Sequence, residues 1–419
     1  MPSNASNWDE YLEVAAVTDV GMRRSNNQDS YVVQLAADED AWESRGHMFV
    51  VADGMGAHAA GELASRLAAD GITHHYYKYP QLSPPEAIAR AVRDTNDEIH
   101  RRGEANSEFH NMGTTCSCLL LLPQGALVAH VGDSRVYRMR GNQLHQLTFD
   151  HSLVWEMRAA GQIKGSGAGI PKNVITRSLG PNAVVKPDVE GPFRIQVDDK
   201  FLVCSDGLMA RVEDDEIGLV LSILPTHAAA DFLVDLANVR GGPDNSTLVV
   251  ARVTKELTTS AKRIAPLVVG GEMKPETRIH PANWFVFSAS LLVCIGLVIS
   301  RQFVASTVAG LVAIVTASII AYQTFAKGTA DGGVALSEGR RLGQAPYLDL
   351  DCSPKQATVV ALIESIDSQV AMGTDIAPGT RWDRVKTCLA EAKEKATAGE
   401  YEVAMELTHV AVQIMLSKK

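Results

Sequence analysis

Residues 49–54 read FVVADG, an apolar run that ends in aspartate and glycine. The arrangement returns in LVAHVGDS at residues 127–134 and in FLVCSDG at residues 201–207. A fourth copy, PDNSTLVVARV at residues 243–253, is reversed, because its aspartate precedes the apolar run. Short apolar runs rich in β-branched residues predict buried strands. Each aspartate therefore lies at a predicted strand end, and all four can meet at one edge of a sheet sandwich.

These aspartates are Asp53, Asp133, Asp206 and Asp244. Two like charges about 4 Å apart repel by roughly 4 kcal/mol at an effective dielectric of 20. Divalent cations that prefer oxygen ligands make such a cluster stable. The pattern thus predicts a site for hard metal ions. The alternative is four unrelated turns, since Asp-Gly is also a common turn dipeptide.

Short strands alternate with longer amphipathic segments around these runs. Strands are predicted over residues 13–18, 30–35, 47–52, 114–122, 126–131, 136–140, 143–146, 200–204 and 246–253. Helices are predicted over residues 60–77, 85–102, 152–160, 214–223 and 226–240. Because the strands outnumber the helices and the helices come in blocks, the fold class is α+β, a layered sandwich rather than a doubly wound parallel sheet.

The composition limits the possible functions. The chain has 419 residues, enough for two or three domains, and a net charge of -10, which argues against a nucleic-acid partner. Its six cysteines form no Cys-x-x-Cys pair, and several lie inside apolar runs. They are expected to be buried, reduced thiols in a reducing compartment. The N-terminal segment has no basic region followed by an apolar one, so no secretory signal is predicted.

Residues 282–326 contain no acidic residue and one basic residue, Arg301. Arg301 divides them into residues 283–300 and 303–326, each near the length that spans a ~30 Å hydrocarbon core. We expect two transmembrane helices. Basic residues flank the pair, which predicts a two-span protein of the cell membrane with its other parts in the cytoplasm: Lys274, Arg278, Lys327, Arg340 and Arg341. The alternative is a hairpin buried in a soluble core.

Residues 256–281 and 327–346 are predicted to be linkers, and residues 347–419 a helical C-terminal region. Helices are expected over residues 354–372 and 382–418, with Gly399 interrupting the second. The spacing of small residues around Gly399 is similar to one tetratricopeptide-type unit, but a single repeat is weak evidence and a plain helical hairpin is favoured.

Polar motifs accompany the apolar runs in a fixed order. They are TDVGMRRSNNQDS at residues 18–30, VADGMGAHAAGELAS at 51–65, GTT at 113–115, HVGDSRVYRMRGNQLHQLTFDHS at 130–152, NVITRSLG at 173–180, CSDGL at 204–208 and GGPDNSTLVV at 241–250. With these motifs, residues 8–255 resemble the metal-dependent protein phosphatases of the 2C type, in their bacterial form. The resemblance implies a four-layer α-β-β-α sandwich, antiparallel sheets flanked by helices, and hydrolysis of phosphoserine and phosphothreonine in proteins.

The resemblance also implies a metal-ligand set. Asp53 bridges two Mn²⁺ or Mg²⁺ ions, and the carbonyl group of Gly54 joins one of them. Asp206 and Asp244 bind the other ion. Asp133, together with Asp206, binds a third and weaker ion. No other cofactor is implied.

Two further residues are expected to act on the substrate side. Arg24 holds the substrate phosphate, because its planar guanidinium group binds phosphate through two hydrogen bonds. Asp29 acts through metal-bound water. A hydroxide shared by the two metals then attacks phosphorus, and no protein nucleophile is required.

The chain departs from the family pattern at a few positions. Gln28 stands where many members have Glu, Ala57 replaces a Gly, and Met55 stands where animal members have His. His58 is expected to lie at the surface or behind the metal ligands.

Two other features stay open. The cluster of Arg135, Arg138 and Arg140 is either a solvated strand face or a substrate groove. The Gly-rich residues 162–172 correspond to a loop beside the family's active site, where they could influence the choice of substrate.

The sequence therefore predicts a membrane-anchored, Mn²⁺- or Mg²⁺-dependent protein serine/threonine phosphatase. Its partners would be phosphoproteins, among them a Ser/Thr kinase or the targets of that kinase. One alternative is a pseudo-phosphatase that binds phosphoproteins without hydrolysing them. The other is a signalling scaffold that acts through the C-terminal helices.

Overall fold

The computed structural model describes residues 8–56, 59–163, 170–171, 174–257, 265–270, 281–300, 303–325, 334–337, 339–376 and 380–417. Ala57 and His58, and most of residues 162–172, lie outside this set. The chain forms two compact units. The larger comprises Met1–Pro80, Pro84–Leu267 and Leu336–Lys419, and the smaller comprises Gln81–Ser83 and Val268–Ala335.

Two antiparallel sheets form the centre of the larger unit. The first has the order β1 (Leu12–Asp19), β11 (Ser246–Val253), β10 (Lys200–Cys204), β7 (Arg135–Arg140), β8 (Gln143–Gln146) and β14 (Leu348–Asp351). The second has the order β2 (Asp29–Gln34), β3 (His47–Met55), β5 (Cys116–Leu122), β6 (Gly125–Val131) and β9 (Asp188–Phe193), and β4 (Gly113–Thr114) also pairs with β3.

Alternate residues of each sheet point into a shared core. Phe49, Val51 and Leu119 come from the second sheet, whereas Phe201 and Val249 come from the first, and all five are buried together. The period of two follows from strand geometry, in which successive side chains point to opposite faces.

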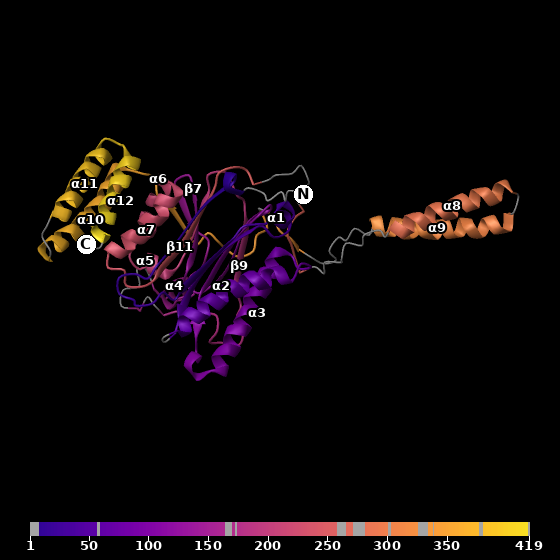
Figure 1. Ribbon diagram of the computed structural model, residues 1–419, viewed down its shortest axis with the longest axis horizontal. Coiled ribbons are helices and arrows are strands. Elements are labelled where there is room, and N and C mark those ends of the chain that lie inside the picture. Colours follow the sequence, from indigo (N-terminus) through magenta and orange to yellow (C-terminus); the bar gives the residue numbers. More distant parts are fainter. Residues whose placement is uncertain are drawn as a thin grey trace. The chain divides into compact units, whose positions relative to one another are not determined.

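Helices cover the outer faces of both sheets (Figure 1). The helices α2 (Ala60–Lys78) and α3 (Pro84–Ala105) pack on the second sheet, while α6 (Asp214–Ile223) and α7 (Thr226–Val239) pack on the first. The result confirms the predicted four-layer α-β-β-α sandwich. The shorter helical elements are η1 (Trp8–Glu10), α1 (Glu39–Arg45), η2 (Ser107–Phe109), α4 (Leu153–Ala159) and α5 (Asp206–Met209).

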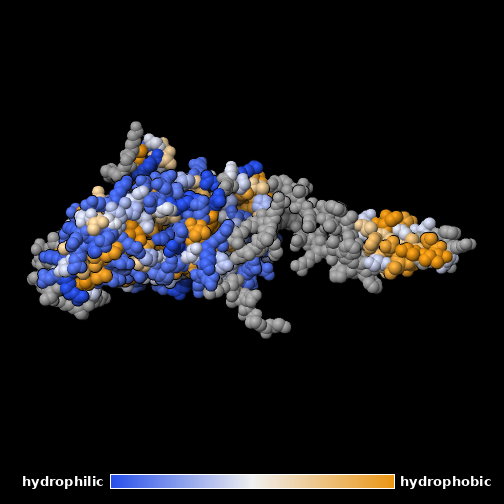
Figure 2. Space-filling model, turned by 90° about the horizontal axis from the view of Figure 1, so that it is seen from above, coloured by the Kyte–Doolittle hydropathy of each residue, from blue (hydrophilic) through white to orange (hydrophobic). Residues whose placement is uncertain are grey.

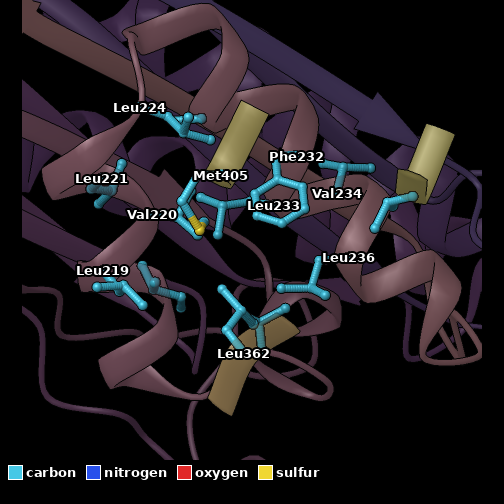
Figure 3. Close-up of a cluster of buried hydrophobic side chains, with 14 of the residues drawn as sticks. Leu219, Val220, Leu221, Leu224, Phe232, Leu233, Val234, Leu236, Leu362 and Met405 are labelled. Atoms are coloured by element: carbon cyan, nitrogen blue, oxygen red, sulfur yellow. The ribbon is translucent and has the colours of Figure 1, made fainter. Parts of the chain in front are cut away.

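Three C-terminal helices pack against α6 and α7, mainly through the last of the three. They are α10 (Gln356–Ile376), α11 (Thr380–Thr397) and α12 (Tyr401–Leu416). Figure 3 shows Leu362 of α10 and Met405 of α12 among the apolar side chains of α6 and α7, including Val220, Phe232 and Leu236. These side chains belong to one continuous hydrophobic core. The C-terminal helices are therefore built onto the sandwich.

Residues 339–352, which we call the strap, connect the two sheets at their open edges. Leu342 forms a β-bridge with Gly191 at the edge of the second sheet. Farther along, β14 pairs with β8 at the edge of the first sheet. The strap thus supplies hydrogen bonds to two edge strands, whose backbone groups would otherwise lack strand partners there.

The smaller unit contains two apolar helices, α8 (Pro281–Ile299) and α9 (Phe303–Phe325), which lie side by side. Its β12 (Val268–Val269) pairs with β13 (Val334–Ala335). Hydrophobic residues dominate the surface of the helix pair in Figure 2, and Leu292, Ile299 and Leu311 are among those exposed.

The predicted transmembrane hairpin over residues 282–326 needs correction. Among the residues that the structure describes, no helix combines the length and the apolarity required to cross a membrane. A crossing helix needs about 20 predominantly apolar residues in one run. The finding also overturns the predicted integral membrane anchor and the localisation as a two-span protein of the cell membrane.

Candidate metal centre and active site

The predicted aspartates converge at one edge of the sandwich. Asp29, at the start of β2, lies opposite Asp53 of β3 in the strand register. The side chains of Asp53, in β3, and Asp206, the first residue of α5 just after β10, lie within hydrogen-bonding reach of each other. Asp133, which follows β6, interacts electrostatically with Asp206, and Asp244, which precedes β11, interacts with Asp29 and Asp206. Both sheets therefore contribute to one acidic cluster.

Burial and mutual repulsion raise the pKa values in this cluster. Burial, followed by the charges of Asp206 and Asp244, raises the pKa of Asp29 to about 7. Burial and the charge of Asp206 raise the pKa of Asp133 to about 8. The pKa values of Asp53 and Asp206 are raised as well, mainly by burial. Opposite charge supplied by metal ions would favour the ionised form of each group.

Among the residues that the structure describes, two buried oxygens of the cluster have no hydrogen-bond partner. They are Oδ1 of Asp29 and Oδ1 of Asp133, whereas Oδ2 of Asp29 accepts a hydrogen bond of 2.7 Å from Ser205 Oγ. Buried polar atoms without a partner are rare and are often explained by an ion or a water. Carboxylate oxygens are the ligands that Mn²⁺ and Mg²⁺ prefer. The residues present therefore fit the implied metals.

The ligand oxygens are not already arranged around a common point. Within the described part of the chain, no three Asp, Glu, His or Cys side chains form a group that could by itself hold an ion. Two contacts explain this result: Asp53 is hydrogen-bonded to Asp206, and Asp244 is paired with Arg24. Carboxylates can reorient once a cation replaces these contacts, and the unpartnered buried oxygens of Asp29 and Asp133 are then available to it.

The backbone at Gly54 is tightly enclosed. Its N–H group donates to the carbonyl group of Gln28 at 3.1 Å. A Cβ atom at Gly54 would lie 2.1 Å from the carbonyl oxygen of Gly61, in the first turn of α2. The side chain of Gln28 donates to the carbonyl group of Gly56 at 3.3 Å. Gln28 therefore supports the turn that carries the Gly54 carbonyl group.

Arg24 lies at the rim of the cluster. Its Nη2 atom is 2.7 Å from Asp244 Oδ2, and half of its side chain is exposed. The guanidinium group is thus at the acidic edge and accessible to a substrate in solution. This position is compatible with the predicted contact to phosphate.

Asn245 is a functional residue that the sequence interpretation missed. It is buried, its Oδ1 accepts from the N–H group of Gln28, and its Nδ2 donates to the carbonyl groups of Val20 and Asn26, each at 2.9 Å. Because Asn245 directly follows Asp244, these three bonds hold the loop that carries Arg24 close to Asp244. The only signal in the sequence is the Asn of the Pro-Asp-Asn stretch at the start of a strand.

Arg135 matches neither of its two predicted alternatives. Its side chain is largely buried, binds both carboxylate oxygens of Asp150 and also pairs with Asp214. Arg140 pairs with Asp199 through two hydrogen bonds. Arg135 is therefore a buried ion-pair partner, not a solvated strand residue or part of a substrate groove.

A cavity of about 570 Å³ lies away from this edge, and Leu122, Pro192 and Leu257 are among the residues that line it. The strand registers place it at the opposite end of β3, where His47 pairs with Leu121. None of the predicted site residues lines it. Its location therefore separates it from the acidic cluster.

Comparisons with known proteins point to one family. The family model described as protein phosphatase 2C matches residues 23–244. The protein phosphatase PhpP of Streptococcus pneumoniae is 35% identical over 253 residues, which cover 58% of this chain and 99% of PhpP. The serine/threonine phosphatase stp of Listeria monocytogenes is 34% identical and is covered to 96%.

Solved structures give the same result. The Mycobacterium tuberculosis serine/threonine phosphatase PstP/Ppp is 34% identical, with a TM-score of 0.52 over 58% of this chain and 100% of that chain. The catalytic domain of the protein phosphatase PstP in complex with two manganese ions is 34% identical, with a TM-score of 0.51 over 58% of this chain and 99% of that one.

Proposed function

This chain belongs to the protein phosphatase 2C family, and we propose that its acidic edge is the centre at which phosphoserine and phosphothreonine are hydrolysed. The enzyme is a serine/threonine phosphatase that uses Mn²⁺ or Mg²⁺, and its substrates are phosphoproteins. The observation that carries the proposal is the contact between Asp53, in β3, and Asp206, the first residue of α5, whose carboxyl groups lie within hydrogen-bonding reach at this edge.

The metal ligands are proposed as follows. Asp53 would hold both ions, the Gly54 carbonyl group would contribute to one of them, and Asp206 and Asp244 would hold the other. Asp133 adds a third, weaker position next to Asp206. When bound, the ions supply Lewis-acid activation of water and of the phosphoryl group. The raised pKa values of Asp29 and Asp133 support this proposal, because they mark a place where negative charge lacks compensation.

Arg24 and Asp29 act on the substrate and on water. Arg24 exchanges its contact with Asp244 for the substrate phosphate, and its planar fork orients the phosphoryl group and stabilises charge that develops on it. The unpartnered Oδ1 of Asp29 accepts a proton from a water molecule at the same edge. We also propose that the substrates include proteins modified by a Ser/Thr kinase.

The test uses the full chain with a small aryl phosphate and Mn²⁺. Asp53→Asn and Asp206→Asn should each reduce kcat/KM by more than about 100-fold, because each change removes charge that compensates the ions. Asp70→Asn, at an exposed position of α2, is the matched control and should leave kcat/KM unchanged. Full activity in both site variants would refute the assignment of the site. Binding of a phosphopeptide without turnover by the unmodified chain would instead favour the pseudo-phosphatase alternative.

A further inference from the structure

We propose that Tyr347 of the strap is a positioning residue for the loop that carries Asp133. The match to the family model ends at residue 244, so Tyr347 lies outside the segment that the model describes. The proposal builds on the role proposed above for Asp133. Its test, however, measures the position of the loop directly and does not require that role to be correct.

The strap is fixed to β9 through Glu190, a buried carboxylate. The hydroxyl group of Tyr347 donates to Glu190 Oε1 at 2.6 Å, and the N–H group of Ala345 donates to Glu190 Oε2 at 3.1 Å. A Cβ atom at Gly343 would overlap the same carboxylate. On the other side, the N–H group of Tyr347 donates to the carbonyl group of Gln146 at 2.9 Å. Tyr347 therefore contacts both sheets.

One path from Tyr347 to the site follows β9. Glu190 and Asp188 are two residues apart and so point to the same face of the strand. Oδ2 of Asp188 accepts a hydrogen bond of 2.9 Å from Nε2 of the buried His151, while Oδ1 accepts from Arg177. A shift of β9 would therefore also move the imidazole ring of His151.

A second path runs through aromatic rings. The ring of Tyr347 meets Phe149 edge to face, with centroids 5.4 Å apart. The ring of Phe149 in turn lies 6.3 Å from the ring of His151, at an angle of 48°. Such aromatic pairs contribute stability beyond the area that they bury. Both paths from Tyr347 therefore meet at His151.

His151 holds the residue that precedes Asp133. The N–H group of Gly132 donates to Nδ1 of His151 at 3.0 Å, and the N–H group of His151 donates to the carbonyl group of Gly132 at 2.7 Å. Nδ1 thus accepts, and the ring proton lies on Nε2, where it is donated to Asp188. Gly132 has φ +116, and a Cβ atom there would lie 2.6 Å from Thr115. The loop before Asp133 therefore cannot shift unless His151 moves with it.

Hydrogen exchange in the full chain, without added metal, tests the proposal. Tyr347→Ala should accelerate exchange of the Gly132 and His151 amides by about tenfold, the change expected when about one hydrogen bond's worth of local stability is lost. Tyr347→Phe, which keeps the ring, should give a smaller acceleration. Tyr11→Ala is the matched control, because Tyr11 also contacts a ring edge to face, that of Trp8. It should leave both amides at the unmodified rate.

Activity gives a second readout. The Mn²⁺ concentration that half-activates hydrolysis of a small aryl phosphate should rise several-fold in Tyr347→Ala, while kcat at saturating Mn²⁺ changes little. If Tyr347→Ala does not fold, Tyr347→Phe decides. Unchanged exchange of the Gly132 and His151 amides in the folded variants would overturn the proposal. If exchange accelerates while Asp133→Asn is fully active at every Mn²⁺ concentration, the positioning stands and the role proposed for Asp133 fails.

Discussion

Asp53, in β3 of the second sheet, and Asp206, the first residue of α5 just after β10 of the first sheet, form a hydrogen-bonding contact at the acidic edge of the sandwich. Such a bond requires a proton between two carboxyl groups that would otherwise repel each other. The contact therefore couples the packing of the two sheets to the protonation of the site, and several measurable consequences follow from the residues around it.

The first prediction concerns pH and metal. In the chelator-treated chain, Asp29 and Asp133 keep their protons up to pKa values of about 7 and 8, whereas in the unfolded chain they ionise near pH 4. Between these values the folded state binds more protons than the unfolded state. The free energy of unfolding must then fall as pH rises from about 4 to about 8, by about 1.4 kcal/mol per pH unit for each group.

Thermal unfolding of the full chain with a chelator checks this expectation. The Tm should be lower at pH 7.5 than at pH 5.5, and Mn²⁺ should raise it more at the higher pH, because binding requires ionised ligands. Asp133→Asn removes one of the titrating groups and should reduce the pH dependence. An identical pH slope in this variant would contradict the assignment.

The second prediction concerns Asn245. Asn245→Ala removes three hydrogen bonds to the loop that carries Arg24, each worth about 1 kcal/mol. We expect kcat/KM for a small aryl phosphate to fall by about 10- to 100-fold, with a higher KM, because phosphate binding requires Arg24 in place. Steady-state kinetics on the full chain measure both parameters.

Asn96→Ala is the matched control for this experiment. Asn96 is also buried and also makes three hydrogen bonds to backbone groups, at Gly180, Asn182 and Ala183. It should lose a similar amount of stability with a much smaller change in KM. Equal changes in KM for the two variants would mean that Asn245 acts only through stability.

The third prediction concerns the carbonyl group of Gly54. Gly54→Ala places a Cβ atom 2.1 Å from the carbonyl oxygen of Gly61 and 2.5 Å from that of Gln28, so the turn must move. We expect weaker Mn²⁺ binding, measured by calorimetry, together with a loss of activity. Gly339→Ala is the control, because a Cβ atom there has no neighbour within 4 Å. Unaltered Mn²⁺ affinity in Gly54→Ala would argue against this carbonyl group as a ligand.

The fourth prediction concerns the C-terminal helices. Leu362 and Met405 are buried against α6 and α7 (Figure 3). Leu362→Ala should destabilise the chain by about 2–5 kcal/mol, the usual cost of a cavity in a core. Because α6 and α7 belong to the sandwich, the unfolding transition of the whole larger unit should shift. A separate, earlier transition of the C-terminal helices alone would show that they are an independent domain.

Much of the sandwich could be predicted because its strands and helices have regular apolar patterns. The elements that were missed have weak patterns. Strand β9 contains Gly191 and Pro192, which disfavour a strand, and β14 reads LDLD within residues 347–419, which were predicted to be a helical region. Helix α1 has only seven residues, most of them charged or polar. The apolar residues 282–326 led to the opposite error: residues 283–300 and 303–326 were each judged to be near spanning length, whereas no described helix has the length and apolarity to cross a membrane.

The acidic cluster was predictable because each aspartate adjoins a strand end, where sequence indicates position. Asn245 and His151 were not, because their importance depends on partners distant in the sequence, such as Val20 and Asp188. The departure at Ala57 and the interpretation of His58 fall outside the described residues. The metal roles of the individual aspartates stay predictions until the variants above are measured.

The strap has a consequence for the connectivity of the chain. The chain leaves the larger unit after Leu267 and re-enters it at Leu336. The segment that contains α8 and α9 is therefore an insertion, and both of its ends connect to the larger unit. A single proteolytic cut within residues 268–335 would therefore break the polypeptide into two fragments but leave the larger unit folded. The two fragments would remain associated through the strap and the shared core of α6, α7, α10 and α12. Separately expressed halves should then reassemble by fragment complementation.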